Sequence, residues 1–148
     1  MWNQFIQFTV NDHHQFVRLQ QFVKDFQAAR ELGNDTTVDD PKWLNYFDQS
    51  AIKRFWWPTD EEVKQVNQLL KSLPSEERRA HPTLQNPWDF ASWLDALYHA
   101  EHKLLNVELE DDIHGRLTFE TWSWPYGNVD ALRWHVEIFG FTITKEDI

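Results

Sequence analysis

The sequence predicts a single α+β domain over residues 1–148. We expect a mixed sheet of about four strands, with about five helices packed mainly on one face. Two observations predict this class. Apolar residues recur at helical spacing through most of the chain up to residue 102, and at the two-residue spacing of strands near both ends. The chain is also long enough for one core, and its 16% aromatic content supplies large apolar surfaces to fill that core.

The first two elements have clear boundaries. Alternating apolar residues predict a strand within 2–10. A helix then follows from Asn11 or Asp12 to about Arg30, because apolar residues recur there at three- and four-residue spacing after a capping residue. Gly33 ends this helix, since glycine adopts the left-handed capping conformation at little cost.

Three more helices are predicted between residues 40 and 102. The first opens at Asp40-Pro41 and the third at Asn86-Pro87, because proline suits the first helical turn. The second has the clearest start, a capping box in which Thr59 and Glu62 satisfy each other's free backbone donors. Its apolar positions form a stripe that ends before Pro74: Val63, Val66, Leu69, Leu70 and Leu73.

The last third of the chain changes to strand spacing. Alternation over 105–109, a turn at 111–115 and alternation over 117–119 predict a β-hairpin. A helix beginning at Asn128 and a strand over 141–144 complete the chain. A strand–helix–strand unit crosses over right-handed, so we expect its two strands to be parallel.

Composition limits the classes of function. The absence of cysteine excludes disulfides and cysteine-based zinc sites, and is consistent with a reducing compartment. A net charge of −10 repels phosphate backbones, so we expect no nucleic-acid partner and favour a basic protein partner, although such acidity is also ordinary surface chemistry. Without a signal-peptide pattern or a long apolar run, the chain is expected to be cytoplasmic, with no membrane partner.

The densest aromatic run lies between the predicted hairpin and the last helix. Trp122 and Trp124 have the opposite strand parity to Leu117 and Phe119, so either a bulge intervenes or the indoles lie away from the core. The run either forms an interaction surface or packs the turn. The candidate binding residues are Trp122, Trp124, Tyr126 and Asn128, the last because a helix start offers backbone N–H groups.

No catalytic residue, metal ligand or cofactor is assigned from the sequence. His99 and His102 are three residues apart, but the pattern is not H-E-x-x-H, and His102 lies where helix gives way to strand. The chain also has no nucleophile elbow, dinucleotide fingerprint or phosphate-binding loop.

Small size, acidity and excess aromatic residues favour a non-enzymatic cytoplasmic protein-binding domain. In its physical properties such a domain would resemble an acidic inhibitor or immunity-like protein, which acts on a basic partner through an aromatic surface. The alternative is a small enzyme or ligand-binding domain, with a Trp/Tyr-lined pocket and acid–base groups from His99, His102 or Glu120. A third possibility is homo-oligomerisation, in which the aromatic rings are buried in a symmetric interface.

Overall fold

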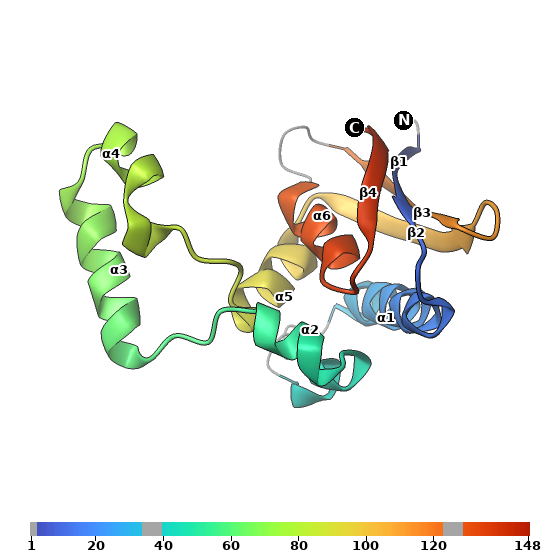
Figure 1. The fold of residues 1–148 in the computed structure, drawn as a ribbon, viewed down its shortest axis with the longest axis horizontal. Helices are drawn as coiled ribbons and strands as arrows, with labels where there is room; N and C mark the ends of the chain where they lie inside the picture. Colours follow the sequence, from blue (N-terminus) through green and yellow to red (C-terminus); the bar gives the residue numbers. More distant parts are fainter. Residues whose placement is uncertain (1–2, 34–39, 123–128) are drawn as a thin grey trace.

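The computed structural model describes residues 3–33, 40–122 and 129–148. Its sheet has the strand order β2-β3-β1-β4 (Figure 1). The strands are β1 (Gln4–Thr9), β2 (His102–Leu109), β3 (His114–Thr121) and β4 (Thr142–Asp147). The predicted α+β class with a four-stranded sheet is confirmed.

The sheet is antiparallel rather than mixed. Strand β1 pairs in antiparallel fashion with both β3 and β4, so these two strands run in the same direction, as expected on either side of the last helix. They are not neighbours, because β1 lies between them. The N-terminal strand takes this central place with Ile6 and Phe8 completely buried. The spacing of apolar residues predicts that β3 and β4 run in the same direction. It cannot show that β1, which is distant in the sequence, lies between them.

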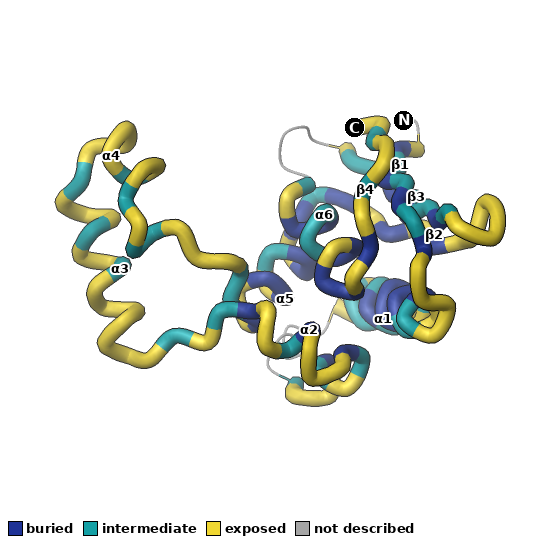
Figure 2. The backbone as a smooth tube through the Cα atoms, viewed as in Figure 1, coloured by how far each residue is buried: buried dark blue, intermediate teal, exposed yellow. Residues whose placement is uncertain are grey.

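Helices α1, α5 and α6 cover the inner face of the sheet, where most of the burial lies (Figure 2). Helix α1 (His13–Leu32) begins where the Asp12 carboxylate accepts from two backbone N–H groups, and ends at Gly33 with φ 70°. Helices α5 (Phe90–His99) and α6 (Val129–Glu137) pack around it. The largest completely buried side chains include Trp43, Trp93, Phe8, Phe22, Phe26 and Phe119.

Two predicted helices have different boundaries in the structure. The helix expected from Asp40-Pro41 is split into the 3-10 helix η2 (Pro41–Tyr46) and α2 (Gln49–Arg54), because Asp48 caps a new start through Ala51 N–H. The helix expected from Asn86 begins instead at Phe90, since the Asp89 carboxylate accepts from Ser92 N–H. That helix ends at His99, before β2 begins.

Residues 56–89 form an arm that projects from the rest of the molecule (Figure 1). It contains α3 (Asp60–Ser72), α4 (Ser75–Ala80) and the 3-10 helix η3 (Pro82–Leu84). The capping box of α3 is confirmed. All residues of the arm are described and none is buried (Figure 2), so α3 is not among the helices that pack on the sheet. The two ends of the arm meet at its base, where Trp56 N–H donates to the Trp88 carbonyl at 2.9 Å.

Candidate functional site

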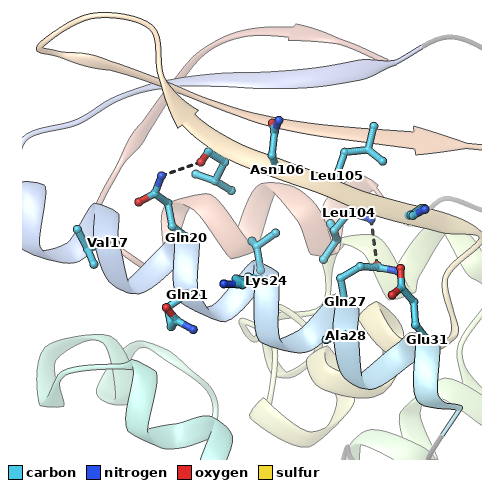
Figure 3. Close-up of a pocket in the computed structure, with 13 residues that line it drawn as sticks. Val17, Gln20, Gln21, Lys24, Gln27, Ala28, Glu31, Leu104, Leu105 and Asn106 are labelled. Carbon is cyan, nitrogen blue, oxygen red and sulfur yellow. Dashed lines mark hydrogen bonds between the residues drawn. The ribbon is translucent and has the colours of Figure 1, made fainter.

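A groove of about 650 Å³ lies between α1 and β2 (Figure 3). Strand β2 is at the edge of the sheet, and α1 runs alongside it. Val17, Gln21 and Lys24 line the helix side of this α1–β2 groove, and Leu105 and Asn106 line the strand side. The groove therefore lies where a sheet edge is accessible to a further chain.

Two glutamines of α1 bind backbone groups of β2 across the groove (Figure 3). The Gln20 side-chain amide donates to the Val107 carbonyl at 2.8 Å, and the Gln27 side-chain oxygen accepts from Leu104 N–H at 3.1 Å. The amides thus supply one donor and one acceptor to an edge strand. The pairing of β2 with β3 is irregular between Leu104 and Asn106, and the intervening Leu105 is exposed in the groove.

The groove continues towards Trp122. A second hollow, of about 300 Å³, shares Gln27, Glu31 and Lys103 with the groove and reaches Trp122. This indole follows the end of β3 and is 57% exposed, whereas the inward-facing residues of β3 are buried. The alternative in which this indole lies away from the core is confirmed for Trp122.

The other candidate binding residues cannot be placed in the same way. Trp124, Tyr126 and Asn128 lie outside the described residues, so the prediction for each of them stays untested. Of the candidate binding residues, the structure associates Trp122 with a hollow. The remaining lining residues come from α1, α5 and β2, and no local sequence motif connects them to the tryptophan run.

Arg30 fixes the Trp122 end of the groove. Its Nε donates to the Tyr98 carbonyl at 3.1 Å and its Nη2 to the Ala100 carbonyl at 2.8 Å. These bonds join the end of α1 to the last turn of α5 and to Ala100, which follows that helix. Burial lowers the pKa of the Arg30 guanidinium. Arg30 therefore holds the end of α1 against the end of α5, beside the exposed indole of Trp122.

The opposite end of the groove leads into an acidic hairpin. Strand β2 continues from Val107 through Glu108 to Leu109, and the turn that follows carries Glu110, Asp111 and Asp112. All four carboxylate residues are exposed. The groove and its adjoining hollow thus extend between an exposed tryptophan and a cluster of carboxylates, with buried and exposed apolar residues along the walls of the groove. An apolar contact area with a polar rim is typical of protein interfaces.

The residues considered for acid–base chemistry do not come together. His99 is exposed and its Nε2 lies 3.4 Å from an Asp95 carboxylate oxygen. His102 is completely buried. Glu120 pairs in register with Lys103, one residue along from the His102 pairing, so strand alternation directs it to the other face of the sheet. Across the described ranges, no three His, Asp or Glu side chains are grouped as a metal site would require.

His135 is a further unusual residue that sequence reasoning did not single out as a site. It is completely buried, and neither ring nitrogen hydrogen bonds to any described residue. Its ring centroid lies 4.7 Å from that of Phe22 and 5.2 Å from that of Trp93. This desolvation, with a smaller contribution from nearby His102, lowers the pKa of His135 to about 3. The neutral imidazole is buried in the core and does not line the α1–β2 groove.

Comparison with known protein families, curated proteins and solved structures finds no match to this chain. Within residues 3–33, 40–122 and 129–148, no helix combines the length and apolar composition needed to cross a lipid bilayer.

Proposed function

We propose that this chain is a non-enzymatic, cytoplasmic protein-binding domain, which holds a segment of its partner along the α1–β2 groove and against Trp122. One observation supports the proposal above all. A 57% exposed indole lines a hollow that adjoins the α1–β2 groove and shares Gln27, Glu31 and Lys103 with it, and the groove itself lies at a sheet edge. Tryptophans in such positions dominate the binding energy of many protein interfaces.

The geometry of the groove favours an extended partner segment. A peptide that joins a sheet edge gains backbone hydrogen bonds, and its alternate side chains enter neighbouring pockets. Here the Val107 carbonyl and Leu104 N–H are held by Gln20 and Gln27 side chains, which a peptide backbone can replace. Leu105 and Val17 then provide apolar contacts on opposite walls.

Charge favours a basic partner. The net charge of −10 steers positively charged proteins towards the chain, and the carboxylates of the β2–β3 hairpin concentrate this charge beside one end of the groove. An acidic surface beside an apolar groove is what we expect of an acidic inhibitor that neutralises a basic protein. We expect the association rate with the partner to fall as salt concentration rises, because screening weakens steering.

Affinity capture from the native cell lysate, followed by reconstitution with the purified partner, tests the proposal. The groove variants are Trp122→Ala and Leu105→Asp. Trp57→Ala is the matched control, since Trp57 is 51% exposed but lies on the arm, away from the groove. Thermal unfolding of each variant establishes that it remains folded.

We expect both groove variants to lose a stoichiometric partner that the wild type and Trp57→Ala retain. With purified components, the dissociation constant should rise at least about tenfold for Trp122→Ala, as for a residue that dominates an interface. If a partner binds both groove variants as tightly as the wild type, the groove is not its binding site and the proposal is wrong.

A further inference from the structure

The arm presents an uncovered apolar strip on α3. Val63 is 40% exposed and Leu70 is 43% exposed, and the exposed Asn67 lies between them. At 100° per residue, positions 63, 67 and 70 fall on one side of the helix. Val66, Leu69 and Leu73 extend the same stripe but are half-buried, and Val66 lines a hollow of about 320 Å³ with Leu84 and Trp88 of the arm, so the uncovered part of the stripe is the side of Val63 and Leu70. The remaining surface of α3 is polar, so the helix is strongly amphipathic.

Contacts with the core do not account for an ordered α3. The hydrophobic core and the residues packed against it include no residue of α3, α4 or η3. A helix of 13 residues is marginal in water on its own. Ordering its backbone costs conformational entropy, which burial of an apolar face normally offsets. The strip therefore indicates a surface that another helix covers.

We propose that the covering element is α3 of a second copy of this chain, packed antiparallel across a two-fold axis near Asn67. Val63, Val66, Leu70 and Leu73 recur at intervals of three, four and three residues, which is the seam spacing of paired helices. A two-fold pair buries the same strip on both copies and closes without leaving a free surface.

Charge favours the antiparallel orientation. The first turn of α3 carries Asp60, Glu61 and Glu62, whereas Lys71 lies in its last turn. Beyond it, α4 adds Arg78 and Arg79 in its last turn, together with two glutamates at its start. Antiparallel pairing places the acidic start of one helix towards the lysine end of the other. Parallel pairing would instead bring the two acidic first turns together, which is repulsive.

This interface is separate from the α1–β2 groove and does not depend on the proposed function. The groove is lined by α1 and β2, and the strip belongs to the arm. Variants of the two surfaces can therefore be tested independently, and failure of either proposal leaves the other intact.

The absence of cysteine allows a direct test by cross-linking in the full-length chain. Asn67→Cys places a thiol on the strip, beside the proposed axis, so that it meets its own counterpart. Gln68→Cys is the matched control, since this neighbouring exposed residue faces away from the strip. Val63→Cys reports orientation, because residue 63 meets its own counterpart only in a parallel pair. Analytical ultracentrifugation of the wild type gives the oligomeric state.

We expect a dimer in the ultracentrifuge at about 100 μM, a concentration that fills a dimer of micromolar dissociation constant. Under mild oxidation, Asn67→Cys should form the disulfide-linked dimer at least about tenfold faster than either Gln68→Cys or Val63→Cys, given the steep distance requirement of a disulfide. The double variant Val63→Asp/Leu70→Asp should be monomeric, whereas Ile113→Asp, at a 59% exposed site outside the arm, should remain dimeric.

Three results would overturn the inference. The first is a monomeric wild type at that concentration. The second is equal cross-linking of Asn67→Cys and Gln68→Cys. The third is preferential cross-linking of Val63→Cys, which would show a parallel pair.

Discussion

Replacing His135 by leucine should make the protein less sensitive to acid. The imidazole lies in an aromatic environment beside Phe22, Trp93 and Phe139, and neither of its nitrogens has a hydrogen-bond partner among the described residues. Its pKa is lowered to about 3 in the folded chain. In the unfolded chain a histidine titrates near about 6.5. The unfolded state therefore binds a proton that the folded state excludes.

The sign and size of the effect follow from this difference. Above pH 6.5 the imidazole is neutral in both states, and it makes no pH-dependent contribution. As the pH falls below 6.5, the unfolded state is stabilised by protonation, and the free energy of unfolding drops by roughly 1.4 kcal/mol per pH unit. The loss reaches roughly 3 kcal/mol at pH 4 and levels off below the folded pKa of about 3.

Urea unfolding of the wild type and His135→Leu at pH 7.5 and pH 4 measures this contribution. The difference in unfolding free energy between the two proteins isolates His135, because all other titrating groups are shared. At pH 7.5 the leucine variant should be at least as stable as the wild type, since it removes buried polar atoms that lack partners. At pH 4 its advantage should have grown by roughly 3 kcal/mol.

His14→Leu is the control for loss of an imidazole, because His14 is exposed. An advantage of His135→Leu that is the same at both pH values would refute the reasoning. It would mean that the buried imidazole takes up its proton as readily as it does in the unfolded chain.

Three further variants test the packing. Gly115→Ala should lower the free energy of unfolding by roughly 1–3 kcal/mol, measured in urea, because the added Cβ would lie 2.7 Å from the Phe8 ring. Arg30→Met removes the donors to two backbone carbonyls and should cost roughly 1–3 kcal/mol in the same assay. Thr59→Ala should speed amide exchange in α3 about fivefold while leaving the global midpoint unchanged, because it removes a cap on an arm without buried residues.

Local chemistry predicted the start and end of several elements. Asp12 and Gly33 bound α1 as the sequence indicated, and Thr59 and Glu62 form the capping box of α3. These signals succeed because a cap involves groups within one helical turn. The start of α5 at Phe90 was missed because Asp89 competes with the Asn86-Pro87 signal, and both are acceptable helix starts.

Features that depend on distant contacts could not be predicted in the same way. The insertion of β1 between β3 and β4 joins the two ends of the chain. The apolar stripe of α3 predicted an amphipathic helix, but it could not show that this helix lies on an arm away from the sheet. For the site, the position of Trp122 away from the core was one of the two alternatives that strand parity left open. The groove and the adjoining hollow that reaches Trp122 needed α1 and β2 to be placed side by side.

The way the arm joins the molecule makes it a natural unit for engineering. Its two ends leave the body side by side, at the bridge between Trp56 and Asp89. Because these two ends are adjacent, a short turn could join them if the arm were deleted. Because no residue of the arm belongs to the hydrophobic core, a protein shortened in this way should keep its sheet, its aromatic core and its groove. Another protein module could be inserted at the same two chain ends.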